Sequence, residues 1–296
     1  MTDKTAILKQ IKSVPSLPSV VIRIRKYLND PEVSFDELAK VIEHDPGLTA
    51  NILQLANSAY FGWSRKIKTV KEAITRLGTN RIFQMVLCMS VAPLVRKAVR
   101  GYDMEADSLW EHSFATAITA EKMSGALRLR GREEAFTAGL LHDMGKIVLG
   151  TFVEVDDEPI KAMVAQDGVP FDEAERLVLG LDHAEVAAEL LKSWKVPDEV
   201  VAAARWHHRP EYAEPRHRQI VDVVHLADTM AMRMGWGSGV DVGRYRLDED
   251  AMLRVGLTAA LAGEITAAAE PEIRELREHY LSGTRSVAHE PERQPA

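Results

Sequence analysis

The chain has 296 residues, 46% of them hydrophobic and 27% charged, and its formal net charge at pH 7 is −7. This composition is that of an ordinary globular protein with a core of its own, and the acidic balance argues against broad, non-specific nucleic-acid binding. The single cysteine, Cys88, excludes an intrachain disulfide and fits a reducing compartment. The sequence shows neither a signal peptide nor a run of about eighteen apolar residues, so we expect a cytoplasmic protein with no membrane segment.

Helix signals dominate the first hundred residues. Ser34 and Glu37 have the spacing of a capping box before an apolar stripe, and Thr69 and Glu72 repeat it before another. A longer apolar helix is predicted over about 82–95. These signals predict a bundle of helices in the first part of the chain.

The segment around Gly78 superficially resembles a helix-turn-helix, because a turn separates two helical stretches. Its second helix would offer Asn80, Arg81 and Gln84 to DNA. The same helix carries a dense set of apolar residues that leaves little polar surface for a groove. These are Ile82, Phe83, Met85, Val86 and Leu87. We therefore favour helical core over DNA binding for this segment.

The rest of the chain continues as helix after helix, which predicts an all-α protein. Helices are expected near 108–128, 132–143, 157–166, 171–178, 183–194, 198–208 and 216–234, with a loop at 236–243. The predicted division is an N-terminal helical subdomain at 1–100, a second helical domain at 101–235, a helical extension at 236–282 and a disordered tail at 283–296.

Histidines and aspartates gather at the ends or inward faces of these predicted helices. The set comprises His112, the adjacent His142 and Asp143, His183, the adjacent His207 and His208, and Asp228. Imidazole and carboxylate together suit Fe, Mn, Zn or Ni. Asp143 could bridge two such ions about 3.5–4 Å apart, as in two-metal hydrolytic sites. Lys146, one turn further on, could then hold a phosphate oxygen.

Each of these residues also has an ordinary structural interpretation. His112 beside an apolar stripe is compatible with a hydrogen-bonded core histidine, and His183 with a surface residue in a first helical turn. His207 and His208 could interact with the end of a helix dipole. Asp228 is harder to explain, because a carboxylate on a buried helix face needs a partner. His225 could orient Asp228 or be a core histidine. Residue spacing alone leaves the two interpretations open.

The order His, His-Asp, His, His-His, Asp resembles that of the HD superfamily of metal-dependent phosphohydrolases. Three N-terminal stretches and three C-terminal ones narrow the resemblance to the HDOD family over about residues 10–235. They are VPSLPSVVIRIRKYL, ELAKVIEHDPGLTANILQLANSAYFG, TVKEAITRLGTNRIFQMVL, LWEHSFATA, AFTAGLLHDMGKIVL and LDHAEVAAELLKSWKVPDEVVAAARWHHRPE. The resemblance implies an N-terminal helical bundle followed by an HD-like helical domain.

The resemblance also implies roles for the site residues. The ligands of a first metal would map onto His112, His142, Asp143 and Asp228. Those of a second metal would map onto His183, His207 and His208, with Asp143 as the bridge. Two divalent transition-metal ions are therefore expected as cofactors, with Asp143 and Lys146 as catalytic residues if the protein is an enzyme.

Two departures argue against turnover of cyclic dinucleotides by an HD-GYP-like site. Arg209 and Pro210 follow His208 where the HD-GYP pattern has an acidic residue and then Gly-Tyr-Pro, a sequence absent from this chain. Ser108 stands where some trinuclear relatives have a glutamate ligand. All the positions that the resemblance implies as metal ligands are present, whereas the residues expected to bind that substrate are not.

Two functions remain open from the sequence. The first is a bacterial regulatory protein in signal transduction that binds metal, with or without a nucleotide or cyclic dinucleotide as a further ligand, and that has weak or no hydrolysis. The second is a metal-dependent phosphohydrolase or phosphodiesterase acting on a nucleotide. The resemblance implies signalling partners on separate chains, since no second signalling domain is recognisable here.

Overall fold

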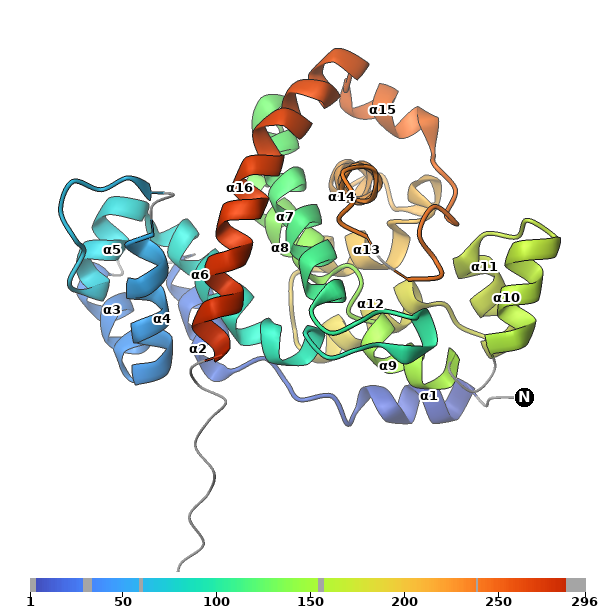
Figure 1. The fold of residues 1–296 in the computed structure, drawn as a ribbon, viewed down its shortest axis with the longest axis horizontal. Helices are drawn as coiled ribbons and strands as arrows, with labels where there is room; N and C mark the ends of the chain where they lie inside the picture. Colours follow the sequence, from blue (N-terminus) through green and yellow to red (C-terminus); the bar gives the residue numbers. More distant parts are fainter. Residues whose placement is uncertain (1–3, 29–33, 59–60, 154–156, 238, 286–296) are drawn as a thin grey trace, which may run out of the picture. The chain divides into compact units, whose positions relative to one another are not determined.

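The computed structural model describes residues 4–28, 34–58, 61–153, 157–237 and 239–285, and in these ranges all regular structure is helical apart from one isolated bridge between Val99 and Met104. The all-α prediction is confirmed. Figure 1 shows the helices in chain order. They are α1 (Lys4–Ile11), α2 (Ser19–Leu28), α3 (Phe35–Glu43), α4 (Pro46–Ala56), α5 (Val70–Leu77), α6 (Thr79–Val95), η2 (Arg100–Tyr102), α7 (Ser108–Ala126), α8 (Arg132–Leu141), α9 (Lys146–Val153), α10 (Asp157–Gln166), α11 (Phe171–Leu179), α12 (His183–Ser193), α13 (Asp198–Trp206), η3 (Pro210–Tyr212), α14 (Arg218–Arg233), α15 (Glu249–Val255) and α16 (Ala259–Arg285).

Contacts between residues divide the chain into two compact units. Among the described residues, the larger unit comprises those of 4–16 and 92–270, and the smaller one those of 17–91 and 271–285. Each unit is thus assembled from segments distant in sequence, unlike the consecutive ranges expected from the sequence. Helix α16 continues through residues 283–285, and the remainder of the predicted tail lies outside the described residues.

Helix caps in the smaller unit form where the sequence places them. The Ser34 side chain accepts a hydrogen bond from the backbone N–H of Glu37, whose carboxylate accepts one from the backbone N–H of Ser34, which completes the capping box of α3. Thr69 caps α5 by accepting from the backbone N–H of Glu72, but the Glu72 carboxylate accepts from the backbone N–H of Lys68, so the predicted capping box forms only in its first half. Pro46 occupies the first turn of α4, where a missing N–H costs nothing, so the DPG sequence both separates α3 from α4 and starts α4.

The second helix of the helix-turn-helix candidate, α6, packs as part of a core. Ile82, Met85 and Val86 are each at most 1% exposed. Of its polar residues, Gln84 is buried, and Arg81 lies 3.6 Å from Glu272 in the C-terminal part of α16. The face that would read DNA is therefore occupied by contacts within this unit, as the core interpretation predicts.

The larger unit is built around α7, which packs against α8 and α14. Buried side chains from these helices, α15 and the start of α16 form one hydrophobic cluster. Gly139 allows the close crossing of α8 and α7, because a Cβ atom there would lie 2.8 Å from the backbone of Ala117. The predicted helices from 108 onward are present, and 239–243 is a loop as expected.

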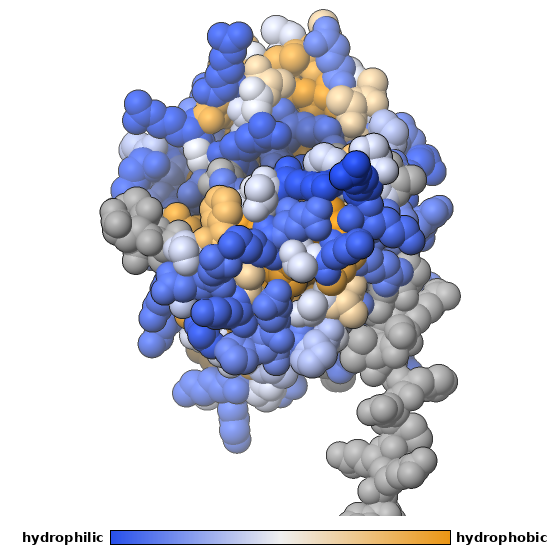
Figure 2. Space-filling model, turned by 90° about the vertical axis from the view of Figure 1, so that its left-hand side faces the viewer, coloured by the Kyte–Doolittle hydropathy of each residue, from blue (hydrophilic) through white to orange (hydrophobic). Residues whose placement is uncertain are grey.

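Exposed surface is mostly polar where Figure 2 views the molecule, and hydrophobic residues form separate patches on that face. Among the described residues no single helix combines the length and apolarity needed to cross a membrane. The pair Glu249–Val255 and Ala259–Tyr280 meets the length and composition test only when taken together, across an 87° bend.

Candidate metal centre

The larger unit brings the predicted ligand residues together. Each comes from the end of a helix or from an inward helix face, and all are at most 5% exposed. They fall into two groups whose ligand atoms lie within 4.8 Å of one another, Asp143 with His183, His207 and His208, and His112 with His142 and Asp228. We call His112, His142 and Asp228 the first ligand group, and His183, His207 and His208 the second ligand group.

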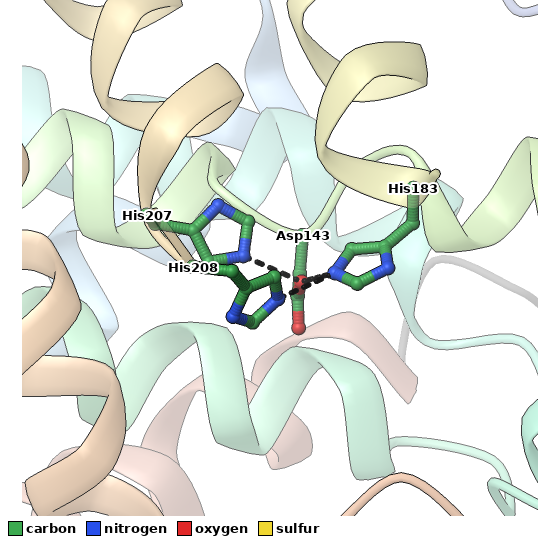
Figure 3. Close-up of side chains that lie close together, drawn as sticks. All are labelled: Asp143, His183, His207 and His208. Atoms are coloured by element: carbon green, nitrogen blue, oxygen red, sulfur yellow. Dashed lines mark hydrogen bonds and ion pairs between the residues drawn. The ribbon is translucent and has the colours of Figure 1, made fainter. Parts of the chain in front are cut away.

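Asp143 lies between the two groups. Its Oδ1 atom is 3.5 Å from His183 Nε2 and 3.6 Å from His207 Nε2. Its Oδ2 atom is 3.6 Å from His112 Nε2 and 3.4 Å from His142 Nε2. Ligands bound tetrahedrally to one ion at about 2.1 Å lie about 3.4 Å apart. The carboxylate therefore presents one oxygen to each group at separations suited to metal coordination. Figure 3 shows the second ligand group converging on Asp143.

Hydrogen bonds fix which nitrogen the histidines present to the centre. The Nδ1 atoms of His112, His142 and His207 lie 2.8, 2.7 and 2.7 Å from backbone carbonyl oxygens. Those oxygens belong to Trp236, Gly139 and Ala204. Because a carbonyl can only accept, each Nδ1 carries the proton and each Nε2 is free to bind a metal in the neutral ring.

His183 is held by a carboxylate that the sequence analysis missed. Its Nδ1 lies 2.7 Å from Glu175 Oε2, and its backbone N–H donates to the same oxygen at 3.0 Å. Glu175 is fully buried on α11 and also accepts a hydrogen bond from the Tyr102 hydroxyl. A carboxylate behind a ligating histidine orients the ring and raises its basicity. Its position on the apolar face of α11 is the signal that would have identified it.

A close backbone contact brings α12 to the turn that carries Asp143. A Cβ atom at Gly145 would lie 1.9 Å from the carbonyl oxygen of His183, so only glycine fits there. Gly145 lies in the turn between α8, which ends at Leu141, and α9, which begins at Lys146, and its φ is not positive. Its physical role is the close approach of two backbones.

An ion-pair network links the start of α12 to the end of α13. Asp182 caps α12 by accepting from the backbone N–H of Glu185 at 2.6 Å. Its other oxygen is bound by Arg176 and, at 2.8 Å, by Arg209. Arg209 follows His208 directly, so this network ties His183 to the His207–His208 pair. Arg209, which stands where the HD-GYP pattern has an acidic residue, is thus bound to Asp182 in this protein.

Lys146 is buried between two carboxylates. Its Nζ atom lies 2.7 Å from Asp143 Oδ2 and 2.7 Å from Asp241 Oδ2. Asp241 also accepts from the Tyr245 hydroxyl at 2.6 Å. Asp241 and Tyr245 were missed in the sequence, because an aspartate in a loop is ordinarily solvated. The predicted phosphate-holding role of Lys146 stays a prediction, and any phosphate would compete with Asp241 for it.

Both ring nitrogens of His225 bond to backbone groups, so His225 does not orient Asp228 through a hydrogen bond, as one of the two interpretations of the sequence required. Its Nδ1 lies 2.6 Å from the carbonyl oxygen of His207, and its Nε2 accepts from the backbone N–H of Asp248 at 2.9 Å. This buried histidine therefore supports the backbone at the second ligand group.

Neighbouring positive charges and hydrogen bonds keep the pKa values of Asp143 and Asp228 low, although both carboxyl groups are buried. Burial raises the pKa of Asp143, but His142 and Lys146 outweigh burial and hold that pKa well below its usual range. Burial likewise opposes ionisation of Asp228, yet the hydrogen bond and charge of His112 lower its pKa to about 2. Both carboxylates are thus ionised at neutral pH.

The histidines divide into two kinds. Burial lowers the pKa of His183, but the charge of Glu175 and the hydrogen bond to it raise that pKa to about 9. Asp228 likewise raises the pKa of His112 against the effect of burial. Burial and neighbouring imidazoles lower the pKa of His207 and of His208 well below the usual value, so these rings are neutral.

Several buried polar atoms of the centre lack a hydrogen-bond partner among the described residues. They are His142 Nε2, His207 Nε2 and Asp143 Oδ1. A buried polar atom without a hydrogen-bond partner destabilises the fold. Several such atoms that converge on one point are expected where a metal binds. The donor set of imidazole nitrogens and carboxylate oxygens fits divalent Fe, Mn, Zn or Ni. The residues present therefore fit a metal centre.

Comparison with known proteins agrees with this architecture. A model of the HDOD domain family matches residues 14–210, more than half of the chain. The chain belongs to the HDOD domain family. An uncharacterised protein of Treponema pallidum (strain Nichols) is 24% identical over 226 residues, which are 75% of this chain. The chain spans 43% of the length of that relative.

Solved structures with this HDOD fold cover nearly the whole chain. An HDOD domain protein of unknown function from Geobacter sulfurreducens has a TM-score of 0.73 and 23% identity, covering 94% of this chain and 98% of its own. A candidate phosphohydrolase from Shewanella amazonensis SB2B has a TM-score of 0.67 and 25% identity, covering 96% and 98%. A candidate signal transduction protein from Marinobacter aquaeolei VT8 has a TM-score of 0.71 and 22% identity, covering 92% and 60%. The HDOD neighbours thus include both phosphohydrolase-like and signal-transduction-like proteins.

Proposed function

We propose that this HDOD protein is a regulatory protein of signal transduction that carries a two-metal centre and hydrolyses nucleotides slowly or not at all. The observation that carries the metal centre is the convergence of the two ligand groups on the two oxygens of Asp143. The first ligand group and Asp143 would hold one ion. The second ligand group and the same carboxylate would hold the other.

The case for slow hydrolysis comes from what surrounds Lys146. Two carboxylates, those of Asp143 and Asp241, already neutralise its ammonium group. The cavity beside it has a volume of about 10 Å³, room for about one water molecule, and is lined by His112, Asp228 and Tyr245 among others. A nucleotide phosphate would have to displace Asp241 and Tyr245 to reach the centre from this side. Bound metal would supply Lewis acidity and structural rigidity.

A phosphohydrolase is the second candidate. The complete ligand set favours it, because a protein that only docks partners has no need for seven converging metal-binding side chains. A neighbour of similar fold that is named as a candidate phosphohydrolase is consistent with it. A nucleotide or cyclic dinucleotide is the proposed ligand in either case, with signalling proteins as further partners and the cytoplasm as the location.

Metal content and activity, measured together, test the proposal. Full-length protein is purified without chelators or an affinity tag, and its metals are determined by mass spectrometry beside an Asp143→Ala variant. We expect about two transition-metal ions per chain in the wild type and loss in the variant. Loaded protein is then assayed against linear and cyclic nucleotides. Turnover that depends on Asp143 would favour the phosphohydrolase, and failure of the wild type to retain metal after reconstitution would reject the metal centre.

A further inference from the structure

A second cavity adjoins the metal centre on the side of His208. Its volume is about 400 Å³, and it is lined by His208, Glu211 and a stretch between residues 246 and 254. His208 is 5% exposed, so its imidazole forms part of the cavity wall. It is the member of the two ligand groups that this cavity reaches.

The lining of this cavity is acidic. Arg254 donates to Asp222 at 2.6 and 2.9 Å and to Asp248 at 2.7 Å, so its charge is already neutralised. The remaining charged side chains of the wall are Glu211, Arg246, Glu249 and Asp250. Within the described residues none of these four side chains forms an ion pair. Three carboxylates thus face one guanidinium, and the surplus attracts cations and repels phosphate.

His208 is held less firmly than the other ligand histidines. The rings of His112, His142, His183 and His207 each have Nδ1 bound to an oxygen, whereas His208 Nδ1 has no hydrogen-bond partner among the residues described. Its ring stacks on Tyr245 with centroids 3.8 Å apart, and its Nε2 lies 2.8 Å from His183 Nε2. Figure 3 shows its other ring nitrogen turned away from Asp143. His208 can therefore swing without breaking a hydrogen bond through Nδ1.

We propose that the acidic cavity is the entry route for divalent transition-metal ions and that His208 is the ligand through which they enter and leave. This inference rests on the proposed metal centre. The small cavity beside Lys146 is an unfavourable route, because it has room for about one water molecule and Lys146 lies in its wall. The wide acidic cavity instead concentrates cations next to the least restrained ligand.

The rate of metal loading tests this route. Metal-free full-length protein is mixed with Co²⁺ in a stopped-flow instrument, and the visible absorbance of bound Co²⁺ is followed. We expect the triple variant Glu211→Gln, Glu249→Gln, Asp250→Asn to load about tenfold more slowly at low ionic strength. The difference should shrink in about 0.5 M salt. Arg246→Gln should load faster, because it removes a cation of the wall that has no ion-pair partner within the described residues.

A matched control separates the cavity from net charge. The variant Glu105→Gln, Glu173→Gln, Glu264→Gln removes the same charge from exposed positions outside the cavity and should load close to the wild-type rate. Equal slowing in both triple variants, or equal rates in all variants, would overturn the route while leaving the metal centre intact. Absence of Co²⁺ binding to the wild type would instead reject the metal centre and the route with it.

Discussion

The two ligand groups are braced by different means. In the first ligand group the histidine rings donate to backbone carbonyl oxygens, those of Trp236 and Gly139. In the second, His183 is backed by the buried carboxylate of Glu175, and His208 Nδ1 has no hydrogen bond from any residue that the structure describes. A carbonyl fixes a ring without adding charge, whereas a carboxylate also makes the ring more basic. The second ion should therefore depend on charge, pH and exchange more strongly than the first.

Removal of the shared bridge should have the largest effect, because it acts on both groups. Asp143→Ala leaves each group one ligand short and leaves the Lys146 ammonium with Asp241 as its remaining partner. Breaking a buried ion pair typically costs about 3–5 kcal/mol. We expect both metals to be lost and the metal-free protein to unfold at a lower denaturant concentration. Retention of one full equivalent of metal by a folded variant would show that Asp143 serves one ion only.

Neutralising Glu175 should weaken metal binding by the second ligand group and leave the first ligand group nearly unaffected. Glu175→Gln keeps an acceptor for His183 Nδ1 but removes the charge, and loss of such an outer partner typically weakens metal affinity about 10–100-fold. We expect that loss for one of two equivalents in a titration with Zn²⁺ or Mn²⁺, with the other nearly unchanged. Glu173→Gln, an exposed position on the same helix, is the control. Equal weakening of both equivalents would contradict the comparison.

His207 and His208, the two neighbouring histidines of the second ligand group, should contribute unequally to the affinity for the second ion. His207 is fixed by the carbonyl of Ala204, whereas His208 is held by ring stacking on Tyr245. We expect His207→Ala to cost about tenfold more affinity for the second ion than His208→Ala, since an already ordered ligand binds at lower entropic cost. Isothermal titration of the two variants side by side decides this. A larger loss for His208→Ala would mean that stacking on Tyr245 orders it as well as a hydrogen bond does.

Sequence reasoning succeeded where local chemistry was explicit. The caps at Ser34 and Thr69 follow from local side-chain chemistry, and the helices follow from apolar periodicity. The ligand residues came from unusual residue types at helix ends and from family resemblance. Their convergence could not be derived from spacing, because it depends on tertiary contacts such as the approach of His183 to Gly145.

The residues that sequence reasoning missed fall into two classes. Glu175 could have been found, since a carboxylate on the buried face of an amphipathic helix needs a partner, as was argued for Asp228. Asp241 could not, because nothing local distinguishes a loop aspartate that binds a buried lysine from a solvated one. The division of the chain into units was also beyond local signals, since residues 4–16 and 271–285 pack with segments far away in sequence.

A change of pH should have the smallest effect of these tests. It should lower the stability of the metal-free protein and raise its affinity for the second ion as pH increases. In the metal-free protein His183 has a pKa of about 9, above the roughly 6.5 of an unfolded chain. Its imidazolium pair with Glu175 therefore stabilises the fold fully below about pH 6.5, and that contribution is lost as pH rises through about 9. A metal must displace the same proton, so affinity for the second ion should increase about tenfold per pH unit between pH 7 and 9.

Thermal unfolding of metal-free protein and metal titration over pH 7–9 measure the two slopes on one sample. We expect stability to fall and affinity to rise with pH, and both slopes to flatten in Glu175→Gln, because the carboxylate that raises the His183 pKa is gone. The Glu173→Gln control should keep both. Slopes that persist in Glu175→Gln would place the titrating proton elsewhere, and the difference between the two groups would then lie in geometry instead of charge.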